Sequence, residues 1–264
     1  MKDILTEIVE HKRTEVENFK IQLPMDLLSK KVESMLDTPL TSMRKALMSS
    51  DNGIIAEFKR KSPSKGWIKE EGKADIIPLS YQDNGASAIS ILTDSNYFGG
   101  CDDFILKARK SGVTIPILYK NFIIDEYQLL QARLCGASAV LLIAACLSKA
   151  ECMRLAHKAH ELNMEVLLEM HSEQELEYAD ITPDMCGVNN RNLGTFITDI
   201  ENSYRLAQQL PIDACKVSES GISNPKTISE LREAGFNGFL IGENFMKYEA
   251  PGTALAEFIR HINH

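Results

Sequence analysis

The stretch Ile54-Ile55-Ala56-Glu57-Phe58 is a short apolar run that leads into polar residues, and runs of this kind recur along the rest of the chain. Eight such runs are strand candidates, and they cover residues 54–58, 88–92, 115–118, 139–143, 165–168, 185–189, 215–218 and 238–241. From Ile54 to Ile259 the interval is about 206 residues, or about 26 per unit, which matches a strand, a helix and two loops repeated eight times. The pattern predicts an α/β fold, a (β/α)8 TIM barrel.

Amphipathic segments with helical spacing separate the runs, at residues 125–134, 149–162, 203–209 and 225–233. Gly112, Gly136 and Gly235 follow helical segments, a position that glycine often takes. A doubly wound open sheet is the alternative fold. The regular alternation of eight apolar runs, with no G-x-G-x-x-G after the first of them, favours the barrel.

The residues before the first run have a different pattern. Ile4, Leu5, Ile8, Val9, Lys12 and Val16 recur at helical spacing, Pro24 and Asp26 open a second helical stretch, and Thr41-Ser42 can cap a third. We therefore expect residues 1–50 to form an N-terminal helical extension that packs on the barrel. Residues 51–264 then form the catalytic barrel, in one structural domain overall.

Composition and charge exclude several kinds of partner. The chain has 264 residues, 44% of them hydrophobic and 25% charged, as in an ordinary soluble globular protein. The 29 Lys and Arg residues against 37 Asp and Glu residues give a net charge of −8, which argues against nucleic acid or an anionic membrane as a general partner. No run approaches the roughly 18 apolar residues of a membrane span.

The cysteines and histidines do not point to a metal site. Six cysteines are scattered without a C-x-x-C pair, so we expect buried free thiols rather than zinc ligands or disulfides. His157 and His160 lie three residues apart on a helical segment, far from any strand end. The N-terminal residues 1–7 carry charges every few positions and lack the apolar run of a secretory signal, so we expect a cytoplasmic protein.

Polar residues stand where five of the expected strands end. They are Glu57 and Lys59 at the first strand, Lys120 at the third, Glu169 at the fifth, Asn189 and Arg191 at the sixth and Glu219 at the seventh. In a TIM barrel these strand ends form the rim that carries the active site. Each residue alone could be a solvated strand end. Burying so many charges on one rim costs free energy unless they are paired, however, so the set favours a functional site over a stabilising role. His171, at the exit of the fifth strand, receives no catalytic role here.

Two other parts of the rim predict binding surfaces. The second and fourth strands end in apolar residues and Phe98 follows the second, which favours a flat hydrophobic group. The loops after the seventh and eighth strands contain Ser220-Gly221 and Gly242-Glu243. Small residues let backbone N–H groups approach an anion, and phosphate commonly binds at this corner of the fold.

Taken in order, these residues resemble one family, indole-3-glycerol phosphate synthase. The first motif runs from Ile54 to Gly66, IIAEFKRKSPSKG, and is fairly specific by itself. The resemblance covers essentially the whole chain, the helical extension included. It continues through Leu92-Thr93, Tyr97-Phe98-Gly99-Gly100, Lys120 with Phe122-Ile123, Leu168-Glu169, Asn189-Asn190-Arg191-Asn192-Leu193, Glu219-Ser220-Gly221-Ile222 and Leu240-Ile241-Gly242-Glu243.

The resemblance implies a substrate and a set of site residues. The substrate would be 1-(2-carboxyphenylamino)-1-deoxyribulose 5-phosphate, closed to indole-3-glycerol phosphate with loss of CO2 and water, without a metal or organic cofactor. The implied catalytic residues are Glu57, Lys59, Lys120, Glu169, Asn189 and Glu219. The implied substrate-binding residues are Ser62, Pro63, Phe98, Arg191, Ser220, Gly221, Gly242 and Glu243. We expect a monomer, with a weak homodimer as the alternative.

One residue departs from the family pattern. Where the family usually has Lys-Asp-Phe, this chain has Lys120-Asn121-Phe122, so we expect a neighbouring negative charge to be missing and the pKa of Lys120 to differ. Two other functions stay open from the sequence. One is another phosphate-binding barrel such as phosphoribosylanthranilate isomerase, which usually uses a Cys and Asp pair. The other is a non-catalytic scaffold that binds a partner through its N-terminal helices, although this extension could equally form a lid over the mouth of the barrel.

Overall fold

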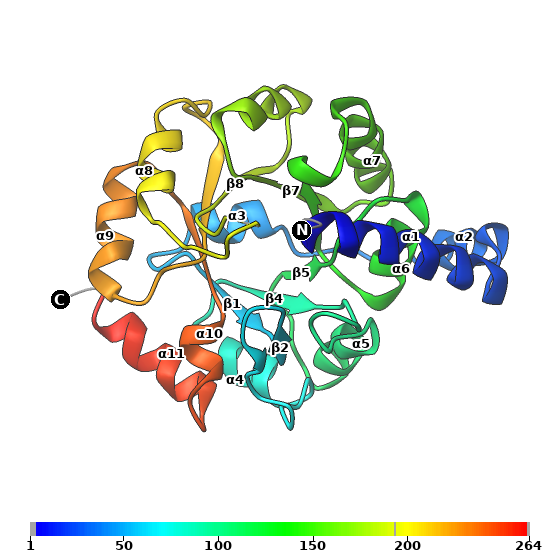
Figure 1. Ribbon diagram of the computed structural model, residues 1–264. Helices are drawn as coiled ribbons and strands as arrows, with labels where there is room; N and C mark the ends of the chain where they lie inside the picture. The colour runs from blue at the N-terminus through cyan, green and yellow to red at the C-terminus, as the bar shows by residue number, and fades with distance from the viewer. Residues whose placement is uncertain (1–3, 193, 263–264) are drawn as a thin grey trace.

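Eight parallel strands close into one barrel, in which β1 pairs with both β10 and β4 (Figure 1). The structure, a computed structural model, describes residues 4–192 and 194–262. The barrel strands are β1 (Ile54–Phe58), β4 (Ala88–Leu92), β5 (Ile117–Lys120), β6 (Ala139–Ile143), β7 (Glu165–Met170), β8 (Met185–Asn189), β9 (Cys215–Glu219) and β10 (Gly238–Ile241). The predicted TIM barrel is confirmed, and the open sheet is excluded because every barrel strand has two neighbours.

Helices surround the barrel on its outer face (Figure 1). They are α4 (Ile77–Asp83), α5 (Asp103–Lys110), α6 (Glu126–Cys135), α7 (Lys149–Glu161), α8 (Glu201–Ala207), α9 (Pro225–Glu233), the short α10 (Glu243–Met246) and α11 (Pro251–Arg260). Loops carry the hairpin β2 (Lys61–Ser62) and β3 (Gly66–Trp67) and the 3-10 segments η1 (Ala144–Cys146) and η2 (Glu173–Ile181). None of the helices in the described part of the chain is long and apolar enough to cross a membrane.

Alternation along each strand divides the core into two layers. Ile55, Leu118, Leu167 and Val217 belong to one buried cluster, inside the barrel. The residues next to them, such as Ile54 and Ala56, belong to a second cluster between the sheet and the helices. The polar residues at the strand ends have the parity of the inner layer, so the barrel directs them to its mouth.

Several strands and helices differ slightly from the sequence expectation. The third strand was expected at 115–118 but spans Ile117–Lys120, because Pro116 has no N–H to donate to a neighbouring strand. β7 and β9 extend to Met170 and Glu219, so Lys120, Glu169 and Glu219 lie within strands rather than after them. α8 begins at Glu201 instead of 203, since the Asp199 carboxylate accepts the Glu201 N–H. Leu193, residues 1–3 and residues 263–264 lie outside the described residues.

Three helices precede the first strand, α1 (Ile4–Gln22), α2 (Met25–Glu33) and α3 (Met43–Met48). Ser42 caps α3 as expected, accepting the Lys45 N–H at 3.0 Å. Met43 and Leu47 of α3 are buried with the inner layer of the barrel. The Glu165 carboxylate at the start of β7 accepts the N–H groups of Met43 and Arg44, so α3 closes the end of the barrel opposite the mouth.

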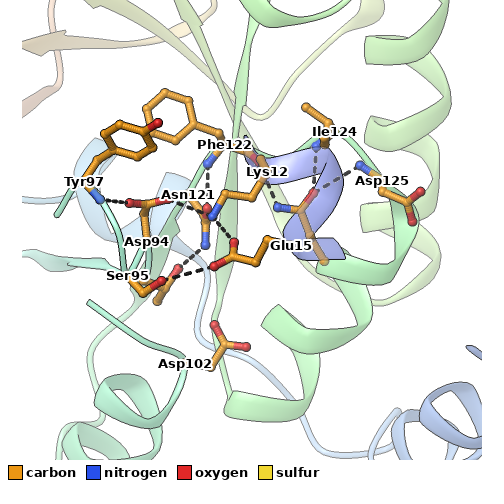
Figure 2. Close-up of polar contacts among 12 residues, drawn as sticks. Lys12, Glu15, Asp94, Ser95, Tyr97, Asp102, Asn121, Phe122, Ile124 and Asp125 are labelled. Atoms are coloured by element: carbon orange, nitrogen blue, oxygen red, sulfur yellow. Dashed lines mark hydrogen bonds and ion pairs between the residues drawn. The ribbon is translucent and has the colours of Figure 1, made fainter. Parts of the chain in front are cut away.

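The first helix α1 extends from above the barrel toward α6 (Figure 1). Its Lys12 is almost fully buried, and Nζ lies 2.8 Å from the equally buried Asp94 of the loop after β4 and also contacts Glu15 (Figure 2). The hydroxyl of Ser95 donates to Glu15, and the Tyr97 backbone N–H donates to Asp94. This buried charge cluster fixes α1 to the loop that follows β4.

Replacing Lys12 by Met should destabilise the protein strongly, because Asp94 and Glu15 then lose the buried ammonium group that pairs with both of them. Breaking a buried pair on one side costs about 3–5 kcal/mol. Lys20→Met on the same helix is the control: Lys20 pairs with Asp125, both partners are about one-third exposed, and we expect a loss under about 1 kcal/mol. Urea unfolding followed by circular dichroism measures both. Equal losses for the two variants would contradict the role given to Lys12.

Candidate active site

A cavity of about 370 Å³ lies at the carboxyl ends of the barrel strands. Every residue that the sequence placed in the site lines it. From the expected catalytic set these are Glu57, Lys59, Lys120, Glu169, Asn189 and Glu219, and from the expected binding set Ser62, Pro63, Phe98, Arg191, Ser220, Gly221, Gly242 and Glu243. The fold therefore brings all fourteen side chains or backbone segments to one space.

Lys120 lies at the centre of this cavity, at the end of β5. Its ammonium Nζ is 2.9 Å from Glu169 Oε2 and 2.6 Å from Glu219 Oε2. The two carboxylates come from β7 and β9 and are 3% and 1% exposed. One cation thus bridges two buried acids from alternate strands, which explains how the interior tolerates all three.

The three groups titrate very differently. Burial raises the pKa of Glu219 to about 8, with Lys120 opposing the shift and Glu169 adding to it. Burial also disfavours charge on Glu169, but Lys120 and His171 outweigh it and hold the pKa of that carboxyl well below its usual range. For Lys120 the surrounding carboxylates overcome the effect of burial and raise its pKa. Near neutral pH the cluster contains a protonated amine beside an ionised carboxylate, the states needed of an acid and a base.

Glu57 and Lys59 form a second pair on the neighbouring strand end, with Nζ and Oε1 2.7 Å apart. Glu57 approaches the loop after β10 so closely that a Cβ on Gly242 would overlap its Oε1. Gly187 of β8 likewise makes room for Glu219, whose Oε1 would lie 2.5 Å from a Cβ there. Glycine at these two positions is needed for space, a role beyond the anion binding that the sequence suggested for Gly242.

Asn121 makes its hydrogen bonds to Thr93, Tyr119 and Phe122. Its Nδ2 donates to the Thr93 hydroxyl at 2.8 Å, and its Oδ1 accepts the Phe122 N–H. The nearby Tyr119 hydroxyl donates to Asp102, a partly buried carboxyl whose pKa burial raises to about 6. Asn121 therefore lies on the side of the α1 cluster (Figure 2), where a further carboxylate would add charge to an already acidic region. The groups that shift the pKa of Lys120 are the three glutamates instead.

The loops after β8 and β9 are joined by Asn190, a buried residue that the sequence analysis quoted but gave no role. Its Nδ2 donates to the Ser218 hydroxyl and to the Ser220 carbonyl, and its Oδ1 accepts from Ser203. Ser220 has a positive φ of 70°, so this network holds it in an uncommon backbone state. Arg191 on the same loop donates to the Ser64 hydroxyl at 2.9 Å and so connects it to the hairpin after β1.

An apolar wall covers the other side of the cavity. Phe98 and Phe122 lie with ring centroids 6.1 Å apart, and Leu92, Leu141 and Ile143 complete the wall. Further lining comes from α1, through Ile4, Leu5 and Ile8. No residue of α1 was among the site residues expected from the sequence, because helical periodicity shows which face is apolar but not what that face covers.

The histidines occupy two kinds of environment. His157 and His160 lie on α7, where they pair with Glu161 and Asp184 at the surface. His171 lies beside Glu169, with Nε2 3.2 Å from Oε1. Within residues 4–192 and 194–262, no group of three or more His, Cys, Asp or Glu side chains is arranged to hold a metal ion.

Comparison with known proteins agrees with this geometry. A family model described as indole-3-glycerol phosphate synthase matches residues 5–258. The chain belongs to the indole-3-glycerol phosphate synthase family. The family predicted from the motifs is thereby confirmed, and with it the class of enzyme, a lyase.

Relatives in this family are similar over their full length. The indole-3-glycerol phosphate synthase of Bacteroides thetaiotaomicron is 57% identical over 263 residues, which cover 99% of this chain and 100% of the relative. The one of Magnetococcus marinus is 43% identical, with 97% and 98% covered. Among solved structures, 3-hexulose-6-phosphate synthase from Salmonella typhimurium has a TM-score of 0.61 at 12% identity, covering 80% of this chain and 99% of that one. At that identity the likeness shows the barrel fold alone.

Gly242→Ala tests the close approach of Glu57 in this synthase family member. The new Cβ displaces the Glu57 carboxylate, and we expect indole-3-glycerol phosphate formation to slow by about 10- to 100-fold, as for a misplaced catalytic group. Gly194→Ala is the matched control, because its Cβ would have only Asn192 Oδ1 nearby, at 3.5 Å. Steady-state turnover measures both. An unimpaired Gly242→Ala enzyme would show that Glu57 needs no such space.

Proposed function

We propose that this chain closes 1-(2-carboxyphenylamino)-1-deoxyribulose 5-phosphate to indole-3-glycerol phosphate, releasing CO2 and water. The observation that carries this proposal is Lys120, held between Glu169 and Glu219 at the centre of a cavity with an apolar wall on one side. The wall suits the aromatic ring of the substrate, and the charged cluster suits proton transfers at the sugar. Family membership supplies the independent support.

In the first step Lys120 acts as general acid. The ring carbon that bears the carboxylate attacks the sugar carbonyl carbon, a C–C bond forms, and the carbonyl oxygen takes a proton from Nζ. The C–CO2 bond then breaks, and its electron pair restores the aromatic ring. The raised pKa of Lys120 keeps it protonated in the free enzyme, as an acid needs to be.

In the second step the new hydroxyl leaves as water. Glu57 and Lys59 assist its departure by supplying a proton, while Glu169 accepts the proton lost from the adjacent part of the forming indole ring. Glu219 raises the pKa of Lys120 through their direct contact. Asn189 and Arg191 orient the sugar hydroxyls and neighbouring carboxylates. Release of CO2 and aromatisation drive the reaction, so the proposal includes no metal or organic cofactor.

The remaining residues hold the substrate. Ser62, Pro63 and Phe98 face the aromatic part, while Ser220, Gly221, Gly242 and Glu243 frame the phosphate. Lys59, Arg191 and Lys247 also line the cavity and supply positive charge for an anionic substrate. Glu243 is itself anionic, so we assign its backbone rather than its carboxylate to the phosphate.

The alternatives from the sequence fit the cavity less well. An isomerase with a Cys and Asp pair would need such a pair in the cavity, but the described residues that line it include no cysteine. A scaffold would leave α1 free to dock a partner, whereas Ile4, Leu5 and Ile8 face the cavity. We propose that residues 1–50, as a unit packed on the barrel of residues 51–264, cover the substrate. Bound substrate should protect α1 from hydrogen exchange if this helix covers the substrate, and should not do so if the helix serves to bind a partner.

Incubating the purified protein with the substrate in EDTA should produce indole fluorescence. Lys120→Ala should lower kcat by about 10²-fold or more, since a general acid contributes that much, and Glu169→Gln should do the same through loss of the base. Unchanged turnover in either variant would remove that residue from the mechanism. Absence of product in the parent protein, with the substrate shown to bind, would refute the function itself.

We also propose that the protein acts as a cytoplasmic monomer, with a weak homodimer as the alternative. Free cysteines, most of them buried, suit a reducing compartment. Large exposed apolar side chains are spread over different elements, among them Ile21 on α1, Met153 on α7 and Tyr248 after α10. Sedimentation equilibrium at micromolar concentration should give the monomer mass of one chain, and a dimer mass would contradict the expectation.

A further inference from the structure

Glu169 and Glu219 flank the same lysine, yet their pKa values shift in opposite directions, down for Glu169 and up for Glu219. Each places Oε2 on Lys120. Their other oxygens differ. Glu219 Oε1 is buried and has no hydrogen-bond partner among the described residues, whereas Glu169 Oε1 lies 3.2 Å from His171 Nε2. Only Glu169 therefore has a second cationic neighbour.

The position of His171 follows from the strand. It comes two residues after Glu169 and directly after the end of β7, so alternation turns its side chain to the same side as Glu169. Its side chain is 12% exposed. The backbone is held at both polar groups: the His171 N–H donates to Glu175 Oε2 at 2.6 Å, and the carbonyl accepts from Asn202 of α8 at 3.1 Å.

The ring has carboxylates at both nitrogens. Nδ1 lies 3.6 Å from Glu175 Oε2 of η2, opposite the contact of Nε2 with Glu169. Neither nitrogen makes an aligned hydrogen bond, so the contacts are ion pairs at close range. The charged groups against the ring are thus Glu169 of β7 and Glu175 of η2, with Lys120 of β5 beyond Glu169. From α8, Asn202 contacts the His171 carbonyl, and the charged Arg205 donates to Asn202 in turn. Two facing carboxylates favour the imidazolium form.

We propose that His171 is a positioning residue for the catalytic reaction, a buried imidazolium that keeps Glu169 ionised and fixes its orientation toward Lys120. This role rests on the proposed function of Glu169 as the base. Glu175 in turn keeps His171 charged. The series Glu175, His171, Glu169, Lys120 alternates in charge and extends from η2 to the cavity.

The charge on His171 agrees with its surroundings. Burial acts against the charged ring, but the two carboxylates prevail and raise the pKa of His171 to about 10. Without that cation, Glu169 would lose one of the two neighbours that favour its ionised form, and burial would raise the pKa of its carboxyl. A smaller fraction of Glu169 would then be ionised and able to accept a proton.

The test compares the pH dependence of kcat/KM in His171→Gln, His171→Lys and the parent enzyme. In His171→Gln we expect kcat at pH 7 to fall about tenfold with KM within about twofold, because loss of the neighbouring cation leaves a smaller fraction of the base ionised. The deficit should shrink as the pH rises through about 8 to 9. His171→Lys should recover most of the activity at pH 7, since the contacts depend on charge. A deficit that is equal at all pH values, with no recovery by Lys, would overturn the proposal.

Matched variants distinguish the positioning role of His171 from the proposed role of Glu169 as the base. His157→Gln, on the exposed face of α7, should leave turnover unchanged. In a Glu169→Gln background, His171→Gln should cause no further loss, as expected when one residue acts through the other. If Glu169→Gln retains full activity, the base assignment fails. If Glu169→Gln is inactive but His171→Gln is unimpaired, the base stands and the positioning role fails.

Histidine ¹⁵N spectra give a readout besides activity. With the signal of His171 assigned from its loss in His171→Gln, the ring should stay protonated up to about pH 10 and titrate lower in Glu175→Gln. Because the folded pKa is raised, the stability that His171 adds is complete below its unfolded value of about 6.5 and disappears as the pH rises through about 10. Titration of the ring near pH 6.5 in the parent enzyme would contradict the proposal.

Discussion

Closure of eight parallel strands into one sheet is the constraint on which the site depends. In a closed barrel every second residue of each strand enters a shared interior, and all the strands end at the same rim. Ile55, Leu118, Leu167 and Val217 fill that interior. The residues two positions further on are therefore directed to the mouth of the barrel. Glu57, Lys120, Glu169 and Glu219 meet there for that reason, although more than 160 residues of sequence separate the first from the last.

Burying these charges restricts what the site can be. A single buried carboxylate is costly, but Lys120 bridges two of them, and Glu57 has Lys59. The two carboxyls that contact Lys120 are not equivalent. Glu169 also has His171 as a second cationic neighbour, whereas Glu219 Oε1 has no hydrogen-bond partner among the described residues. The same strand ends thus hold an ionised and a neutral carboxyl side by side. Gly187 and Gly242 leave the space that Glu219 and Glu57 occupy.

The ends of the barrel are closed by the segments before the first strand. α3 inserts Met43 and Leu47 beneath the inner layer, and the Glu165 carboxylate holds its first turn. α1 lies at the other end, where Lys12, buried with Asp94 and Glu15, fixes it to the loop after β4 (Figure 2). That loop carries Phe98 of the apolar wall. The helical extension therefore contributes to the shape of the cavity as well as to the stability of the barrel.

The sequence by itself determined the barrel, the strand ends that carry the chemistry and the family, because strand period, helix spacing and short motifs are local properties. Parity along the strands predicted which strand-end side chains enter the barrel, and the resemblance to the family supplied the rest of the fourteen residues that line the cavity. Tertiary structure alone decided what each charged group pairs with. The partners of Lys120, those of Asn121, the two carboxylates around His171 and the part of the cavity that α1 lines all depend on distances between residues far apart in the chain. Ionisation follows from those distances and from burial, and neither can be read from a local pattern.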